Sequence, residues 1–204
     1  GNSDAALLLG LIYIKGQDIS QNINEGMYWL KQVKTNAVSD FILGTYYASG
    51  IGLNKSMQNG EKLLQSAANQ GLPMAYFNLS ILNHHQHQPF VDKLKRAKEM
   101  GSSAAGILLA DYFISQAQSE AQLAEARDIY FQLAEKGDGK AQFRLGYMYA
   151  HQLGGGQDMK AAHKWLLEAA NQGNEYARFE LGLLNQLGAL DDTQNIDEAK
   201  KWYK

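Results

Sequence analysis

A small residue recurs at a nearly constant spacing along this chain, inside segments that otherwise carry the apolar pattern of helices. Its positions are Gly10, Gly44, Ser80, Ala110, Gly146 and Gly182. Three of the steps between them are 36 residues long, while the first is 34 and the step from Ser80 to Ala110 is 30. Glycine inside a helix costs about 1 kcal/mol relative to alanine. We therefore predict that a second helix crosses closely at each of these positions, which we call the small-residue positions.

A second set of glycines runs in register with the first. Each lies nine residues before a small-residue position and follows a helical segment; these are Gly71, Gly101, Gly137 and Gly173. Glycine takes the left-handed conformation that ends many helices, so we predict helix C-caps there. Large apolar residues mark the preceding helix, at Trp29, Leu63, Ile129, Trp165 and Trp202. Two helices for each period of about 36 residues predict a repeat solenoid.

The repeat sequence resembles a known family. Residues 141–149 (Ala-Gln-Phe-Arg-Leu-Gly-Tyr-Met-Tyr), 160–165 and 168–173 are similar to the Sel-one-like repeat, a relative of the tetratricopeptide repeat. Residues 47–53 resemble that family's Gly-x-Gly loop between its two helices. The resemblance covers nearly the whole chain and is weakest in the third and fourth repeats.

We accordingly predict an all-α fold, a right-handed α/α superhelix of about six helix-turn-helix repeats that forms one repeat domain over residues 1–204. Because neither end carries a polar capping element, we expect the ends to be truncations or to be covered by something else. The predicted repeats span 3–36, 37–72, 73–102, 103–138, 139–174 and a truncated 175–204.

Two repeats depart from the pattern. The third spans 21 residues from Ser80 to Gly101, where its neighbours span 27, and it carries Asn-His-His-Gln-His-Gln-Pro at 83–89 in place of the glycine loop. The fourth carries Ser-Gln-Ala-Gln-Ser at 115–119. We expect a solvated turn at 83–89, with Pro89 starting the next helix.

The histidines are the strongest candidates for metal chemistry. His84, His85 and His87 lie close together, but Asp92 is the nearest acid and a structural site wants four ordered ligands. His151 and His163 have no acid paired with them in sequence, so we expect partly exposed helix residues. The chain contains no cysteine, which excludes disulfides and thiol chemistry. We predict no metal site and no cofactor.

No motif for catalysis stands out. Gly154, Gly155 and Gly156 lack the Lys-Ser/Thr that follows a phosphate loop, so an interhelical turn is expected. None of the eleven serines has a lysine three residues later. The acidic pairs at 191–192 and 197–198 are typical of turns and helix starts. We predict no catalytic residue and a protein that is not an enzyme.

Charge and hydropathy exclude two classes of partner. The net charge of −2 gives no electrostatic footprint for nucleic acid. The richest apolar stretch, 5–14, falls short of the roughly 20 residues that a membrane helix needs, so we expect no membrane insertion. The compartment stays open between cytoplasmic and exported, whether periplasmic or secreted, because a chain without cysteine suits either and residues 1–4 lack an initiator methionine.

The exposed stripe of each first helix is the candidate partner-binding site. Residues three before and one after each small-residue position share a helical face. Thr45, Asp111 and Tyr147 are the better contact candidates, since burying them without compensation would be costly, whereas the phenylalanines also suit packing between repeats. The predicted contact residues are Phe41, Thr45, Phe77, Ile81, Asp111, Phe143, Tyr147, Phe179 and Leu183.

We expect a non-catalytic scaffold that binds a protein or peptide on this concave stripe. The resemblance implies a role in assembly or signalling, or in host contact if the protein is bacterial and exported. The alternatives are a structural solenoid that self-associates through its uncapped ends and a cell-wall hydrolase, which would need a pocket of converging titratable groups.

Overall fold

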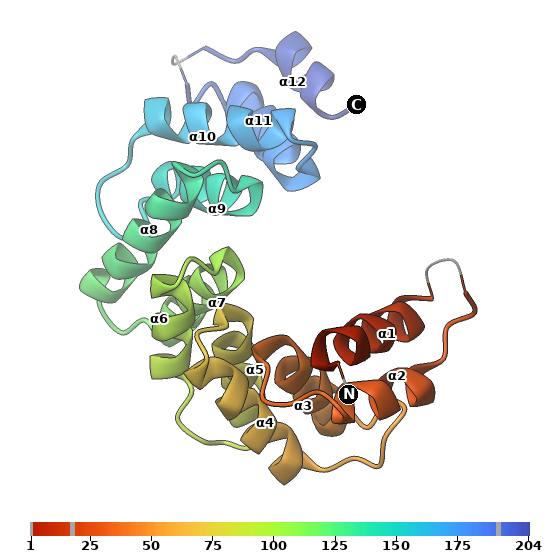
Figure 1. Cartoon of the computed structure of the whole chain (residues 1–204). Helices are drawn as coiled ribbons and strands as arrows, with labels where there is room; N and C mark the ends of the chain where they lie inside the picture. Colours follow the sequence, from red (N-terminus) through yellow and green to blue (C-terminus); the bar gives the residue numbers. More distant parts are fainter. Residues whose placement is uncertain (1, 17–18, 191–192) are drawn as a thin grey trace. The chain divides into compact units, whose positions relative to one another are not determined.

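A computed structural model describes residues 2–16, 19–190 and 193–204 of the chain. Across these ranges the chain forms twelve α-helices and no strand (Figure 1). The helices are α1 (Ser3–Lys15), α2 (Ile23–Lys31), α3 (Ala37–Ser49), α4 (Met57–Asn69), α5 (Pro73–His85), α6 (Val91–Glu99), α7 (Ser103–Gln116), α8 (Glu120–Ala134), α9 (Gly139–Ala150), α10 (Met159–Asn171), α11 (Glu175–Leu187) and α12 (Ile196–Trp202). The all-α prediction is confirmed. The acids Asp191 and Asp192 lie outside the described residues, whereas Asp197 and Glu198 occupy the first turn of α12 as predicted.

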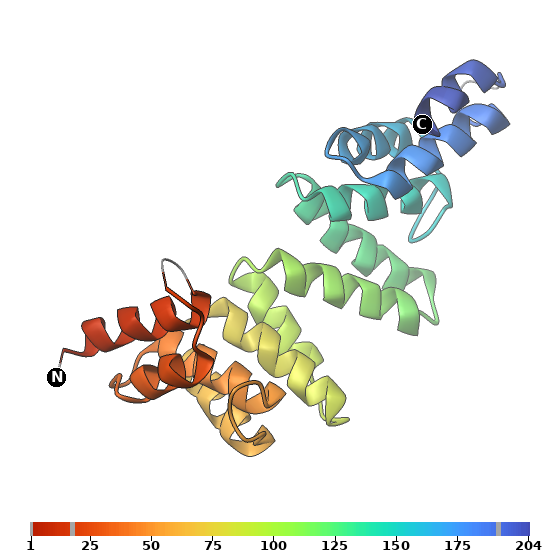
Figure 2. The same cartoon turned by 90° about the vertical axis from the view of Figure 1, so that its right-hand side faces the viewer.

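The chain divides into two compact units, Gly1–Ser102 and Ser103–Lys204. The first contains the helix pairs α1/α2, α3/α4 and α5/α6, and the second contains α7/α8, α9/α10 and α11/α12 (Figures 1 and 2). Within each unit the second helix of a pair also contacts the first helix of the next, and the first helices α3 and α5, and α9 and α11, touch each other. This is the stacking of a helix-pair solenoid. That residues 1–204 form a single repeat domain stays a prediction.

The small-residue positions lie where the two helices of a pair cross. A Cβ atom at Gly44 of α3 would lie 2.9 Å from Cγ of Leu64 and 3.0 Å from the carbonyl oxygen of Gly60, both on α4. Ser80 and Ala110 are buried at the corresponding positions. Close-packed interiors leave no room for a longer side chain at such crossings, so the predicted packing reason is confirmed.

The four predicted cap glycines end the helices as expected. Gly71, Gly101, Gly137 and Gly173 have φ values of 88°, 94°, 87° and 86°. A Cβ atom at any of them would meet nothing within 4 Å, so their requirement is conformational rather than steric. In each case the next residue's N–H reaches back to a carbonyl in the last helical turn, as Leu72 does to Ala67 at 3.2 Å.

The glycine loop at 154–156, between α9 and α10, contacts α8, the second helix of the preceding pair. The N–H of Gly155 donates to Oε1 of Glu120 at 2.6 Å, and a Cβ atom at Gly154 would lie 2.5 Å from the carbonyl oxygen of Leu123. The Arg127 guanidinium lies 5.0 Å from the ring centroid of Tyr149. The loop is thus a turn that joins α9/α10 to α8, which confirms the interpretation of 154–156 as a structural turn.

The third pair differs from the expectation at its turn. Helix α5 continues to His85, so Asn83, His84 and His85 are helical rather than part of a loop. No glycine interrupts the helix there, and the chain turns only at His87, which has a φ of 56°. Helix α6 begins at Val91, two residues after Pro89. Helix α6 has nine residues, whereas α4 has thirteen. This difference accounts for most of the shortening of the third repeat between Ser80 and Gly101.

Apolar residues facing between neighbouring helices form the core of each unit. In the first unit Leu64, Leu79 and Leu82 bring α4 and α5 together, and in the second Leu166 and Leu181 bring α10 and α11 together. Fully burying a leucine side chain contributes about 1.5–3 kcal/mol, so these contacts fix the neighbouring pairs against each other. No helix in the described part of the chain is both long and apolar enough to cross a membrane.

Candidate functional site

An aromatic row runs along α9 and continues onto α11. Phe143, Tyr147 and His151 are spaced four residues apart, which places them on one face of α9. The ring centroids of Phe143 and Tyr147 lie 6.2 Å apart, those of Tyr147 and His151 4.1 Å, and those of Phe143 and Tyr176 5.9 Å. Tyr176, in the first turn of α11, is 73% exposed. We call these four residues the aromatic row.

A hollow of about 550 Å³ lies beside the row, between α7, α9 and the start of α11. Arg144 joins its sides: the guanidinium lies 3.4 Å from Oδ1 of Asp111 on α7 and 6.0 Å from the ring centroid of Phe143. The ion pair is half exposed, which limits its contribution to stability to about 0–1 kcal/mol. The hollow is lined by Ile107, Asp111, Lys140, Phe143, Arg144, Asn174 and Tyr176.

Asp111 also holds α7 to α8. The hydroxyl of Tyr130, a fully buried residue of α8, donates to Oδ1 of Asp111 at 2.6 Å. Burial, reinforced by the hydrogen bond to this carboxylate, raises the pKa of Tyr130 well above its usual range. Asp111 is therefore compensated within the protein, and its half-burial carries no penalty that a partner would have to relieve.

His151 has an acidic partner that its sequence neighbours do not reveal. Nε2 of His151 lies 3.5 Å from Oε2 of Glu180 on α11. The partner comes from the next repeat, 29 residues along the chain, which is why the residues around His151 do not indicate it. His163 on α10 is partly exposed, as expected.

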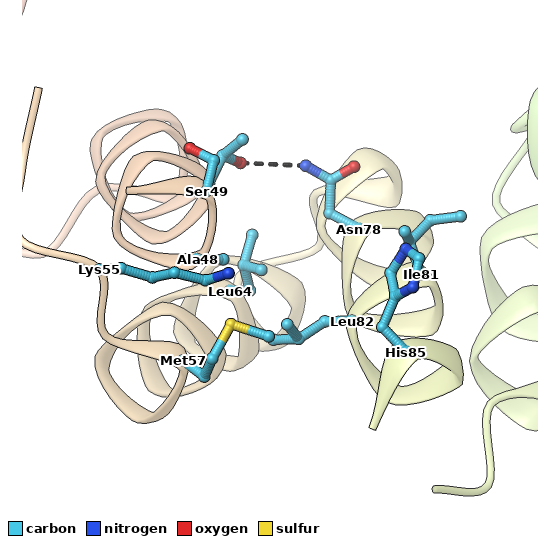
Figure 3. Close-up of a pocket in the computed structure, with 10 residues that line it drawn as sticks. Ala48, Ser49, Lys55, Met57, Leu64, Asn78, Ile81, Leu82 and His85 are labelled. Atoms are coloured by element: carbon cyan, nitrogen blue, oxygen red, sulfur yellow. Dashed lines mark hydrogen bonds between the residues drawn. The ribbon is translucent and has the colours of Figure 1, made fainter. Parts of the chain in front are cut away.

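A groove of about 650 Å³ lies in the first unit, between α3, α4 and α5; we call it the α3–α5 groove (Figure 3). Thr45 donates to the carbonyl oxygen of Phe41 at 2.8 Å and accepts from Nδ2 of Asn78 at 3.0 Å, a bond that ties α3 to α5 (Figure 3). The groove is lined by Thr45, Ala48, Ser49, Lys55, Met57, Leu64, Asn78, Ile81, Leu82 and His85.

The predicted contact residues fall into several places. Thr45 and Ile81 meet in the α3–α5 groove, and Asp111 and Phe143 meet in the second unit's hollow. Phe41 packs against the core formed by α4 and α5, which supports the packing alternative for that residue.

Other predicted residues stand apart from these sites. Phe179 is 54% exposed, and its ring centroid lies 5.9 Å from that of Tyr203 on α12. Phe77 and Leu183 are half-buried and line none of these hollows.

A periodic signal could have found the residues that the sequence reasoning missed. Asn78, Arg144 and Glu180 each stand two residues before a small-residue position, and His85 and His151 each stand five after one. The positions two before, one after and five after a small-residue position are three and four residues apart, so they fall on one helical face. Polar residues inside otherwise apolar helices were therefore a better guide than the phenylalanines. Lys55 and Tyr176 have no such signal.

The histidines at 84–87 do not form a metal centre in this structure. Among the described residues, no group of three His, Cys, Asp or Glu side chains lies close enough to hold a metal ion. The His84 ring packs edge-on against Phe90, with the two ring centroids 4.6 Å apart, while His85 lines the α3–α5 groove.

On α12, the hydrogen bond from the exposed Lys201 to Glu198 raises the pKa of this lysine.

Antiparallel helix pairs in tandem, with hollows lined by their first helices, define a helix-pair solenoid protein. The sequence profile of the Sel1 repeat matches residues 3–32, 37–72, 139–174 and 175–204, and the chain belongs to this family, as its resemblance to the Sel-one-like repeat implied. Residues 73–138 lie outside the matched segments, yet they form the same helix pairs, α5/α6 and α7/α8.

Solved structures share the fold. A Sel1 repeat protein from Oxalobacter formigenes is 28% identical with a TM-score of 0.82, over 98% of this chain and 85% of that one. The protective antigen c5321 of uropathogenic Escherichia coli, described as having an SLR fold, is 24% identical with a TM-score of 0.87, over 98% of this chain. This chain spans 44% of its length.

A more distant structure, the immunity protein Pa5087 of Pseudomonas aeruginosa, is 17% identical with a TM-score of 0.54, over 98% of this chain and 79% of that one. No curated protein matches this chain in sequence.

Proposed function

We propose that this protein is a non-catalytic scaffold that binds a protein or peptide through the first helices of its repeats, in assembly, signalling or host interaction. The chain has the Sel1 repeat fold, and stacked repeats of this kind present extended surfaces to partners. The observation that carries the proposal is the aromatic row of α9 and α11 beside the hollow lined by Asp111 and Arg144.

The composition of this surface suits a protein interface. Tyrosine, phenylalanine and arginine are enriched where proteins meet: the aromatic rings offer a large, rigid contact area, and the arginine guanidinium offers several hydrogen-bond donors in a fixed planar geometry. Tyr176 is the most exposed aromatic of the row, so it is free to enter a pocket on a partner. Arg144 and Lys140 add positive charge at its edge. A partner that presents apolar side chains flanked by acidic ones would complement this surface.

The rigidity of the row also favours binding. Tyr147 is held between the rings of Phe143 and His151, and His151 is held by Glu180. Side chains that are already fixed lose less entropy when a partner binds. We therefore place the centre of the interface at Tyr147 and Tyr176, with the residues of the hollow as its border.

Capture with matched variants tests the proposal. The wild type, Tyr176→Ala alone and the pair Tyr147→Ala with Tyr176→Ala are immobilised and exposed to extracts of the source cell and of a host cell. Captured proteins are identified, and their affinities are then measured with purified partner. Hot-spot residues contribute 2 kcal/mol or more, so the double variant should lose about 30-fold or more in affinity.

The control variant combines Lys160→Ala with Glu168→Ala, two exposed residues of α10, the helix that pairs with α9. It should bind as the wild type does. Equal capture by all variants would remove the aromatic row from the interface. Light scattering separates the alternative: a mass that rises with protein concentration and is insensitive to the tyrosine changes would support a self-associating solenoid instead.

A further inference from the structure

The α3–α5 groove contains a cation that no acid neutralises. Lys55 lines the groove from the loop between α3 and α4, and among the described residues no carboxylate lies within ion-pairing distance of its ammonium group. No aspartate or glutamate lines the groove, and the other titratable residue there is His85. Because no carboxylate in the lining offsets the charge of Lys55, an anionic group complements the groove.

The base of the Lys55 side chain packs against the loop that carries it, while the side chain itself is exposed. A Cβ atom at Gly50 would lie 3.0 Å from Cβ of Lys55, so the loop backbone packs directly against the base of this side chain. The following residue is fixed as well, because the N–H of Ser56 donates to the carbonyl oxygen of Tyr47 at 2.9 Å. Figure 3 shows the side chain reaching from the loop toward the groove.

Apolar side chains form the floor below this cation. Leu64 and Leu82 belong to the core between α4 and α5, and Met57 packs against that core. Leu64 and Leu82 are buried and close the bottom of the groove, while the half-buried Met57 offers aliphatic surface within the same groove as the ammonium. A ligand that fills both parts must carry an anionic group and an aliphatic side chain close to each other. The last residue of a polypeptide meets this requirement, since both groups are attached to its Cα atom.

Asn78 supplies the polar group that a peptide backbone needs. Its Nδ2 donates one hydrogen bond to Thr45, which leaves the second N–H of this amide and its carbonyl oxygen for a ligand. The hydroxyl groups of Thr45 and Ser49 are already engaged with backbone carbonyl oxygens. At about 650 Å³, the groove falls in the range of sites that bind small ligands or short peptide segments.

We propose that the α3–α5 groove binds the free C-terminus of a partner polypeptide, with the α-carboxylate on Lys55 and an aliphatic last side chain on Met57, Leu64 and Leu82. This inference rests on the proposed function, since it takes the partner to be a polypeptide, but it uses a different surface from the aromatic row. The chemistry that it specifies is a terminal carboxylate attached to an apolar residue.

Three peptides test the proposal on the full chain. The first is acetyl-Gly-Ser-Ala-Leu with a free carboxylate, the second is its C-terminal amide, and the third is acetyl-Gly-Glu-Ala-Leu amide, which carries an internal acid instead. Nitrogen-15 NMR titration to about 5 mM measures affinities in the weak range expected for one ion pair and one side chain. We expect the free acid to bind at least about tenfold more tightly than either amide, with shifts centred on Lys55, Asn78 and Leu82.

The variant Lys55→Gln should lower the affinity of the free acid to that of its amide and leave the amide unchanged. Lys62→Gln, at an exposed lysine of α4 outside the groove, should change neither. The proposal would be overturned if the wild type bound the free acid and its amide equally, or if Lys55→Gln lost both equally. It would also be overturned if the internal-glutamate peptide bound tightly, or if no peptide caused a shift. Tyr147 and Tyr176 are unchanged in these variants, so a failed peptide titration would leave the capture test of the aromatic row valid. A failed capture test would likewise leave the peptide titration valid, because it does not involve Lys55.

Discussion

The side chain of Leu166 occupies the space directly beside Gly146: a Cβ atom at position 146 would lie 2.8 Å from Cγ of Leu166 and 3.0 Å from its backbone nitrogen. This contact sets how closely α9 and α10 approach. The same relationship joins Gly44 to Leu64 and Gly10 to Leu30 in the first unit. In these three pairs, a glycine of the first helix and a leucine of the second therefore set how closely the two helices approach.

Gly146→Ala should destabilise the protein even though alanine is the better helix former. The gain in helix propensity is about 1 kcal/mol, whereas overpacking against a fixed backbone costs about 1–3 kcal/mol, so the net loss is up to about 2 kcal/mol. Thermal and urea unfolding followed by circular dichroism measure it. Combining this change with Leu166→Ala should cost less than the sum of the two single changes. An additive result would show that the two side chains do not compete for this space.

Gly154→Ala and Gly156→Ala form a matched pair within one loop. At Gly154 the left-handed φ of 75° and the contact with Leu123 both oppose a side chain, so a loss of about 2 kcal/mol or more is expected. At Gly156 nothing lies within 4 Å of an added Cβ atom, so the change should stay within about 0.5 kcal/mol. Unfolding midpoints distinguish them. Equal effects would mean that the loop does not depend on its contact with α8.

Tyr130→Phe should alter how stability depends on alkaline pH. The folded pKa of Tyr130 is raised, whereas the unfolded chain ionises near the ordinary tyrosine value of about 10. The unfolded state therefore loses its proton first, and the wild type loses about 1.4 kcal/mol for each pH unit above 10 from this group. Phenylalanine has no proton to lose, so the variant's stability should fall less steeply between pH 10 and pH 11. Denaturant titrations at several pH values test this, and parallel curves for the two proteins would contradict it.

Below pH 10 the same variant should be modestly less stable. The lost hydrogen bond to the carboxylate of Asp111 is worth about 1.5–3 kcal/mol, partly offset because Asp111 retains Arg144 and solvent contact. Asp111→Ala should cost a similar amount or more, since it leaves the buried Tyr130 hydroxyl without its acceptor. Urea unfolding at neutral pH measures both changes, and an unchanged midpoint in both would remove the bond between α7 and α8 from the stability of this unit.

The aromatic residues of the second unit should separate into structural and exposed classes. Phe143 packs against the core cluster of α10 and α11, so Phe143→Ala should cost about 2 kcal/mol or more, toward the lower end for a partly exposed phenylalanine. Tyr176 is mostly exposed, so Tyr176→Ala should change stability by less than about 0.5 kcal/mol. Thermal unfolding of each single variant provides the comparison. A large loss for Tyr176→Ala would identify it as a packing residue and weaken its place in the proposed interface.

Much of the fold follows from local sequence. Glycines such as Gly71 and Gly173 end helices because of their own backbone freedom, so the boundary between helices is visible in the sequence. The spacing of Gly146 and Gly182 predicts where helices cross, because only a small residue fits at such a contact. These constraints act on single residues, and a single sequence displays them. The third pair was harder, since a helix without a glycine continues until a residue such as His87 accepts the left-handed conformation.

The candidate surfaces depend on neighbours that are distant in sequence. Nothing near Asp111 indicates that Tyr130 and Arg144 would pair with it, nor does anything near His151 point to Glu180. These pairs lie 19 to 33 residues apart in the chain and meet because the two helices of a repeat pack together or because consecutive repeats stack. The sequence by itself determined the repeat, its helix ends and its small-residue crossings, which are set by backbone conformation and steric size. Tertiary packing decided which polar side chains are already paired and which, like the ammonium of Lys55, remain open to a ligand, since pairing requires two side chains to meet in space.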